Sequence, residues 1–266
     1  MKFFVCWILI LGIPLGIPGP ASAHYSMLFP QVNSGRQGQP VTVIYQWGHP
    51  FEHQLSHAEP PDHLTILTPS GIRIDVTKEL EPIELPGPDG KKVRAFRLQF
   101  TPQERGDFVF LLRTPPIWMP EDAAFVQDNV QVVLHVQVQR GWDAATGGKM
   151  EMTPLTRPYG LQAGMVFQAR VHADSRAMPG TLVEIERYNT APPAALPPDE
   201  HITRTVKTDS DGVVTVSLPE PGWWGLTASR DGGNKEHQGK MYPIRERVTF
   251  WVFVDDPKTM PSTSPK

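Results

Sequence analysis

Proline is the residue that most constrains the fold of this chain. It occupies 29 of 266 positions, about 11% and roughly twice the ordinary usage. Because proline lacks an N–H and fixes φ, it is excluded from helix interiors and from central strands. The composition therefore disfavours long helices and predicts many short strands joined by proline-rich turns.

Charge and hydrophobicity set the broad class. The chain carries 25 Lys and Arg against 28 Asp and Glu, a formal net charge of −3. A nucleic-acid-binding protein would show a basic excess gathered on one face, so we expect no nucleic-acid partner. Hydrophobic residues make up 39% and charged residues 20% of the chain, enough apolar material to form a buried core.

The first 23 residues predict export from the cytoplasm. Lys2 precedes an apolar run, Phe3 to Leu11, and Ala21-Ser22-Ala23 is a small-residue cleavage signal. The run is short for a bilayer span, although an uncleaved anchor stays open as an alternative. Cleavage after residue 23 would remove Cys6, the single cysteine, and make His24 the amino terminus. A cysteine-free exported protein suits the bacterial periplasm, so we expect a soluble periplasmic protein.

Strand periodicity dominates the first half of the mature chain. In the clearest segment, Val132, Leu134 and Val136 alternate with Val133, His135 and Gln137, which predicts one apolar and one largely polar face. Similar runs bounded by Gly, Pro or Asp predict a β-sandwich domain over residues 24–143. The predicted strands are Val41–Trp47, His63–Leu67, Val93–Phe100, Asp107–Leu112 and Val130–Val138.

The pattern restarts after a boundary formed by Gly141-Trp142-Asp143 and the small residues that follow. We therefore predict a second β-sandwich domain over residues 144–266, and an all-β fold for the whole chain. Its predicted strands are Met165–Ala173, Leu182–Tyr188, Ile202–Thr208, Val213–Leu218, Gly225–Ser229 and Arg247–Val254.

Histidines gather in one segment of the first half. His49, His53, His57 and His63 fall within fifteen residues, together with Glu52. Imidazole nitrogen and carboxylate oxygen are ligands of Ni²⁺, Co²⁺, Cu²⁺ and Zn²⁺. The four-residue spacing of the first three would put them on one face of a short helix, but nearby prolines make a loop an equal alternative. A solvated loop that is rich in histidine by chance also stays open.

His24 supports a metal site on separate grounds. An amino-terminal histidine offers its α-amino nitrogen and its ring Nδ1 to one ion. The amine must lose its proton to bind and titrates at pH ~8, so metal binding would weaken in acid. The alternative is a frayed terminus without a ligand role. His201, beside Asp199 and Glu200, is a candidate ligand from the second half.

Catalytic signatures are missing from the sequence. It contains no Gly-x-Ser-x-Gly, no glycine-rich phosphate loop, no His-Glu-x-x-His and no cysteine nucleophile in the mature chain. We therefore predict a protein that is not an enzyme.

Several short sequence motifs occur together, in the same order, in a known family. They are His24-Tyr25-Ser26-Met27, His49-Pro50-Phe51-Glu52, Pro115-Pro116-Ile117-Trp118, Gly141-Trp142-Asp143, Pro154 to Leu161 and Pro221-Gly222-Trp223-Trp224-Gly225. In these motifs the chain resembles the periplasmic accessory component of energy-coupling-factor type nickel/cobalt uptake transporters. The resemblance implies capture of Ni²⁺ or Co²⁺ and delivery to a membrane permease complex.

The resemblance also bears on individual residues. The pattern of the family matches His24, His49 and His201, which implies that they are ligands. His53, His57 and His63 are either additional ligands or a local variation. The second half resembles a transthyretin-like or surface-protein B-type module, so the predicted sandwiches are immunoglobulin-like or transthyretin-like. Such modules are usually scaffolds, and fold alone does not indicate binding.

Three functions follow as hypotheses. The first is a periplasmic Ni²⁺/Co²⁺ carrier with His24 and His49 at its core, which Cu²⁺ or Zn²⁺ would also load in vitro. The second is a copper-binding histidine-brace protein or oxidoreductase. The third is a metal-free carbohydrate- or protein-binding module that uses Trp223 and Trp224.

Overall fold

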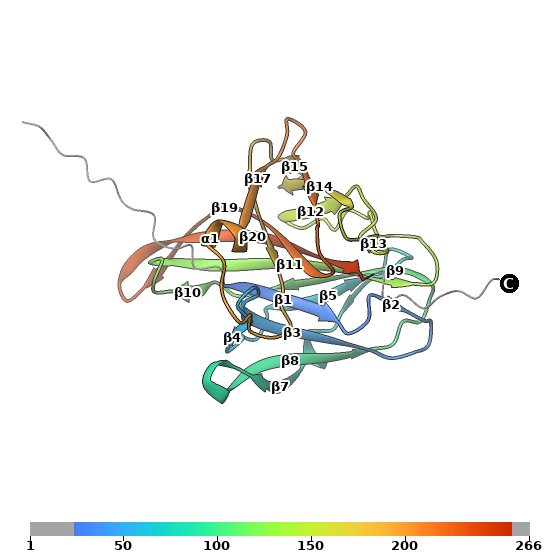
Figure 1. Ribbon diagram of the computed structural model, residues 1–266, viewed down its shortest axis with the longest axis horizontal. Helices are drawn as coiled ribbons and strands as arrows, with labels where there is room; N and C mark the ends of the chain where they lie inside the picture. Colours follow the sequence, from blue (N-terminus) through green and yellow to red (C-terminus); the bar gives the residue numbers. More distant parts are fainter. Residues whose placement is uncertain (1–23, 257–266) are drawn as a thin grey trace, which may run out of the picture.

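The computed structural model describes residues 24–256, which fold almost entirely into β-structure (Figure 1). Strands account for 56% and helices for 4% of the structure, which confirms the predicted all-β sandwich class. The predicted signal peptide, residues 1–23, lies outside the described residues. Within residues 24–256, the helical elements are one short α-helix, α1 (Asp199–Ile202), and two 3-10 turns, η1 (Thr77–Glu79) and η2 (Pro88–Gly90).

One eleven-stranded sheet runs through both halves of the chain. Its centre is the parallel pair β11 (Ala124–Val136) and β20 (Lys240–Asp255), which are in register from Phe125 opposite Ile244 to Val132 opposite Trp251. Three short strands pair with these two central strands: β10 (Ile117–Met119) and β2 (Ser34–Gly35) with β11, and β13 (Leu161–Gln162) with β20. The main order is β17 (Arg204–Lys207), β16 (Leu182–Arg187), β19 (Gly222–His237), β20 (Lys240–Asp255), β11 (Ala124–Val136), β9 (Gly106–Arg113), β5 (His63–Leu67) and β6 (Arg73–Asp75).

Two smaller sheets pack against this shared sheet from opposite sides, as Figure 1 shows. The first contains β1 (Tyr25–Pro30), β3 (Val41–His49), β8 (Lys92–Phe100), β7 (Glu81–Pro86) and β4 (Gln54–Ser56). The second contains β12 (Met150–Pro154), β14 (Val166–Ala173), β15 (Arg176–Ala177) and β18 (Val213–Ser217).

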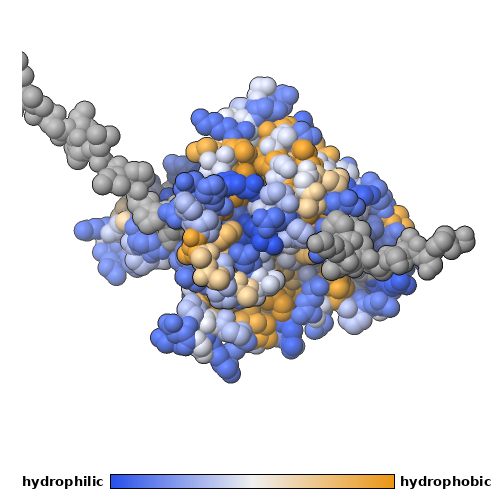
Figure 2. Space-filling view, viewed as in Figure 1, coloured by the Kyte–Doolittle hydropathy of each residue, from blue (hydrophilic) through white to orange (hydrophobic). Residues whose placement is uncertain are grey.

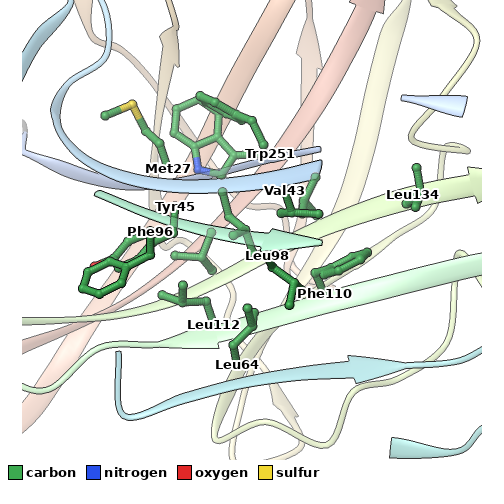
Figure 3. Close-up of a cluster of buried hydrophobic side chains, with 14 of the residues drawn as sticks. Met27, Val43, Tyr45, Leu64, Phe96, Leu98, Phe110, Leu112, Leu134 and Trp251 are labelled. Carbon is green, nitrogen blue, oxygen red and sulfur yellow. The ribbon is translucent and has the colours of Figure 1, made fainter. Parts of the chain in front are cut away.

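Two hydrophobic cores lie between these layers. Met27, Tyr45, Leu98 and Phe110 belong to the first core, drawn in Figure 3. Trp251 of β20 also packs there, whereas its neighbours on the same strand pack into the second core. Because successive strand residues point to opposite faces, the shared sheet contributes to both cores.

The face of the 130–138 strand that was predicted to be largely polar is covered in the structure. Val132 and Leu134 enter the first core as expected, but Val133 is 5% exposed and packs into the second core. His135 bonds the buried Asp107 through its Nδ1, at 2.6 Å. The strand is therefore covered on both faces, because a third layer lies over it.

The strands predicted from the sequence are all present, and β19 and β20 extend well beyond their predicted bounds. The domain boundary predicted at residue 143 falls between β11 and β12. Pairing of β11 with β20 joins the two halves through main-chain hydrogen bonds.

Candidate functional site

Strand register brings the two principal candidate histidines together. Tyr25, the first residue of β1, pairs with Gly48 of β3, so His24 comes opposite His49. Gly48 has φ +148, and a Cβ there would lie 2.2 Å from the Gln54 carbonyl oxygen, so β3 and β4 need glycine to approach this closely. The β1–β3 pairing thus sets the distance between the two imidazoles.

The His24 ring lies between two aromatic neighbours. Its centroid is 4.1 Å from that of His49, at an interplanar angle of 59°, and 4.5 Å from that of Trp47, on which it stacks. Two carboxylates border the pair: Glu121 Oε1 is 3.8 Å from His24 Nδ1, and Glu52 Oε2 is 4.0 Å from His49 Nδ1. The site therefore holds two imidazoles with acidic groups nearby.

Burial keeps the His24 ring neutral at physiological pH. Its side chain is 18% exposed. Desolvation is the largest cause that lowers its pKa, to about 4, and the neighbouring His49 and Arg247 act in the same direction against the opposing effect of Glu121. A neutral imidazole has a lone pair for a metal ion without first losing a proton.

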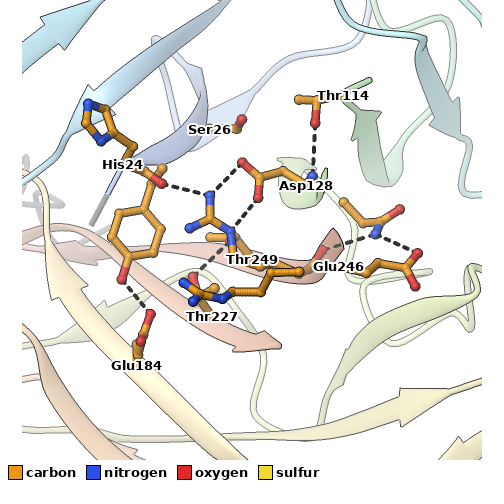
Figure 4. A network of polar contacts seen from close by, with 12 residues as sticks. His24, Ser26, Thr114, Asp128, Glu184, Thr227, Glu246 and Thr249 are labelled. Atoms are coloured by element: carbon orange, nitrogen blue, oxygen red, sulfur yellow. Dashed lines mark hydrogen bonds and ion pairs between the residues drawn. The ribbon is translucent and has the colours of Figure 1, made fainter. Parts of the chain in front are cut away.

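A buried ion pair anchors the backbone at His24. Arg247 of β20 donates Nε to Asp128 Oδ1 at 2.6 Å and Nη2 to the His24 carbonyl at 2.7 Å (Figure 4). Trp251 Nε1 donates to the Ser26 carbonyl. These bonds fix the start of β1 to the shared sheet, so the segment beginning at His24 is well held.

The second half of the chain fixes the turn that follows His49. The Asn189 main-chain N–H donates to the Pro50 carbonyl at 3.0 Å, and its side-chain amide donates to the Phe51 carbonyl at 2.6 Å. Phe51 N–H donates to Glu186 Oε1, and the Thr203 hydroxyl donates to Glu186 Oε2. The position of His49 therefore depends on both halves.

Glu186 is the most perturbed carboxyl group of this region. Glu186 as a whole is 2% exposed. Desolvation raises its pKa to about 8; the bonds from Thr203 and Phe51 act in the opposite direction, and the nearby Glu52 and Glu184 add to the rise. At neutral pH the group is mostly protonated.

The remaining predicted ligands have other surroundings. His53, in the left-handed region with φ 53, donates Nδ1 to the Asn189 carbonyl at 2.8 Å. His57 Nδ1 accepts from the Arg94 main-chain N–H, which leaves the neutral ring without a free lone pair. His63 is exposed at the start of β5, and His201 is exposed on α1. The helix that would align His49, His53 and His57 is absent, because this segment forms a β3–β4 hairpin.

Side chains alone do not form a complete metal site. Within residues 24–256, no group of three or more His, Cys, Asp or Glu side chains is arranged to hold a metal ion. The His24–His49 pair therefore does not complete a metal site by itself, and any further donors must come from elsewhere, such as a free amino terminus or water.

A large cleft adjoins this pair. Its volume is about 1440 Å³, and its lining includes His49, Glu52, Glu121, Tyr25 and Arg247. Tyr25 donates its hydroxyl to Glu184, another lining residue, at 2.9 Å (Figure 4). Hydrophilic side chains gather over α1 and the neighbouring strands in the space-filling view (Figure 2). The site thus opens into a cleft lined mostly by polar residues.

Sequence reasoning missed several residues that build this site. Glu121, Glu186, Asn189 and Arg247 reach it from segments far along the chain. None of them lies in a motif, so no local signal distinguishes them from other polar residues.

By fold and site, this is an all-β protein with a partly buried histidine pair beside a polar cleft. The chain belongs to the DUF4198 family, a domain of unknown function, whose match covers residues 21–232. No curated protein matches the chain. No helix within the described residues has the length and apolar character that a membrane crossing needs.

The likeness of the chain to the following three solved structures is distant. Trypsin-activated alpha-2-macroglobulin from Escherichia coli is 12% identical, with 89% of this chain and 16% of that chain covered and a TM-score of 0.25. A DUF4785 family protein from Legionella pneumophila is 11% identical, with 79% and 53% covered and a TM-score of 0.30. A two-domain fibronectin type-III segment of chicken tenascin is 10% identical, with 86% and 98% covered and a TM-score of 0.21. The chain spans 16% and 53% of the first two, and these low scores carry no argument about function.

Proposed function

We propose that this protein is a periplasmic carrier that captures Ni²⁺ or Co²⁺ and delivers the ion to a membrane permease complex. The observation that carries the proposal is the His24–His49 pair, whose ring centroids are 4.1 Å apart. Imidazole nitrogen suits both ions, and we expect one ion to bind a nitrogen of each ring. Cleavage after residue 23 would add the α-amino nitrogen of His24 as a third donor.

An incomplete protein ligand set is consistent with a carrier. Water would fill the open coordination positions, and a partner can displace water when it receives the ion. With no cysteine in the mature chain, the site has no thiolate to favour soft ions. Cu²⁺ binds nitrogen sites more tightly than Ni²⁺, so selectivity would depend on geometry and metal supply.

Calorimetric titration of Ni²⁺, Co²⁺, Cu²⁺ and Zn²⁺ into protein that begins at His24 tests the proposal. We expect one ion per chain, and a loss of affinity of about tenfold or more for His49→Ala, because one imidazole donor is removed. His57→Ala is the matched control, since its Nδ1 already accepts from Arg94, and it should bind like wild type. Binding that depends on His57 or His63 and not on His49, or no binding at all, would overturn the site.

Delivery needs its own test. Cells that carry His49→Ala in place of the wild-type protein should accumulate less nickel from a limiting medium, and His57→Ala cells should be normal. Normal nickel uptake in the absence of the protein would refute the delivery step.

The histidine pair also suits the copper alternative, because Cu²⁺ takes the same donors. Peroxide-dependent oxidation of a polysaccharide by the copper-loaded protein would favour that function. The carbohydrate-binding alternative has less support, because Trp224 is 4% exposed and the partly buried Trp223 packs on Phe29 and Phe253.

A further inference from the structure

The floor of the cleft is an open face of the shared sheet. Alternate residues of four neighbouring strands line it, for example Thr205 of β17, Glu184 of β16, Thr227 of β19 and Arg247 of β20. The residues between them, such as Ile185, belong to the second core on the opposite face. One face of these strands is therefore apolar and covered, and the other is polar and faces the cleft.

Segments from both halves form the walls. His49 and Glu52 come from the β3–β4 turn, Glu121 from the turn between β10 and β11, and Asp199 and Glu200 from α1. His49 of the candidate pair thus lies at one edge of a much larger cavity that residues from both halves of the folded chain form.

The cavity is far larger than an ion requires. A divalent ion with six waters, at about 30 Å³ for each water, occupies about 180 Å³. The cleft measures about 1440 Å³, and pockets of about 300–1,000 Å³ already enclose drug-sized organic ligands. A hydrated ion alone would leave most of this polar space filled by bulk water.

The charge of the lining favours a cation. Six carboxylate side chains line the cleft against three cationic side chains, Lys207, Arg245 and Arg247. Arg247 is already paired with Asp128, and Arg245 lies 3.6 Å from Asp122. The carboxylates are Glu52, Glu121, Asp122, Glu184, Asp199 and Glu200.

Hydroxyl groups supply hydrogen-bonding capacity of both kinds. Thr181, Thr203, Thr205, Thr227 and Ser229 line the same cavity. A hydroxyl both donates and accepts, so these groups can hold the amine, hydroxyl or carboxyl groups of an organic molecule.

We propose that the cleft takes the ion as a cationic complex with a small amine- or imidazole-bearing organic chelator. His24 and His49 would fill coordination positions that the chelator leaves open, and the polar floor would hold the organic part. The chelator would supply the donors that the described side chains do not provide. This inference rests on the proposed function and specifies the form in which the ion is bound.

Preformed nickel complexes test the inference by calorimetry on protein that begins at His24. Diethylenetriamine gives Ni²⁺ three neutral nitrogen donors, so its complex keeps a double positive charge and three open positions. We expect it to bind about tenfold or more tightly than hydrated Ni²⁺. The nitrilotriacetate complex, which is anionic, should bind more weakly than either because it meets the acidic lining.

Variants separate the cleft from the histidine pair. The double variant Asp199→Asn/Glu200→Gln, on the exposed helix α1, should lose most of the preference for the diethylenetriamine complex and keep its affinity for hydrated Ni²⁺. Asp211→Asn is the control, because Asp211 lies on an exposed turn outside the cleft lining, and this variant should behave as wild type.

Two results would overturn the inference while the proposed function stands. The first is equal affinity of the protein for hydrated Ni²⁺ and for both complexes. The second is a double variant that still prefers the diethylenetriamine complex as strongly as the wild type does. In both cases His49→Ala would weaken the binding of every nickel species. If no nickel species binds, the proposed function fails and this inference fails with it.

Discussion

Replacement of Glu186 by Gln should remove a large pH dependence of stability. Glu186 is buried, and its pKa is about 8 in the folded protein against 4.5 for an ordinary glutamate. The folded state therefore binds this proton more tightly than the unfolded chain. The contribution of this group to the free energy of unfolding is fully present below pH 4.5 and is lost as the pH rises through 8.

The magnitude follows from the two pKa values. Between pH 5 and pH 8, the free energy of unfolding of the wild type should fall by about 3–4 kcal/mol more than that of the variant. Gln mimics the protonated acid, because its Oε1 can accept from Phe51 N–H as Glu186 Oε1 does. Its amide N–H would donate to the Thr203 hydroxyl, which would turn from donor to acceptor. The variant should fold normally for that reason.

Urea denaturation at pH 5, 6, 7 and 8 measures this difference. Glu236→Gln is the matched control, since Glu236 is exposed on the β19–β20 hairpin, and its curve should run parallel to that of the wild type. If Glu186→Gln also runs parallel to the wild type, the group is not a buried acid and the reasoning is wrong.

Three further predictions concern the framework of the site. Arg247→Met should lower the free energy of unfolding by about 3–5 kcal/mol in urea denaturation, because it leaves Asp128 buried without its partner; a loss below about 1 kcal/mol would contradict this. Asn189→Ala should cost about 1 kcal/mol and weaken Ni²⁺ binding several-fold in calorimetry, because it removes the 2.6 Å bond to the Phe51 carbonyl; unchanged affinity would show that this bond does not position His49. In metal-free protein, NMR titration of the His24 ring should give a midpoint near pH 4, and a midpoint near 6.5 would show that the ring is solvated.

Short-range patterns were sufficient to predict much of the fold. The β-branched and alternating runs between proline and glycine turns correctly predicted strands such as β3 and β14. Tyr25–Pro30 was missed because all six residues of β1 are buried, so the strand has no alternation. β7 was missed because Pro82 and Pro86 argue against a strand, although both are tolerated at the edge of a sheet.

Long-range pairing could not be predicted from the sequence. The parallel register of β11 with β20 joins residues more than a hundred positions apart, and no local pattern specifies it. The same limit applies to the site. Composition drew attention to His24 and His49 separately, but only the β1–β3 register brings their rings together.

Histidine density was a poor guide to proximity. His57 and His63 lie close to His49 in sequence, yet His57 bonds to the main chain of β8 and His63 begins β5 in the shared sheet. Conversely, Glu121 lies 3.8 Å from His24 although nearly a hundred residues separate them. Strand direction, and not spacing along the chain, decides which side chains meet.

The most direct measurement of the central claim is a crystal structure of nickel-loaded protein that begins at His24, with the ion located by its anomalous scattering. The account predicts one strong peak about 2 Å from an imidazole nitrogen of His24 and of His49, at the edge of the cleft. A peak on His57, His63 or His201 without this pair, or no ordered ion at all, would contradict it.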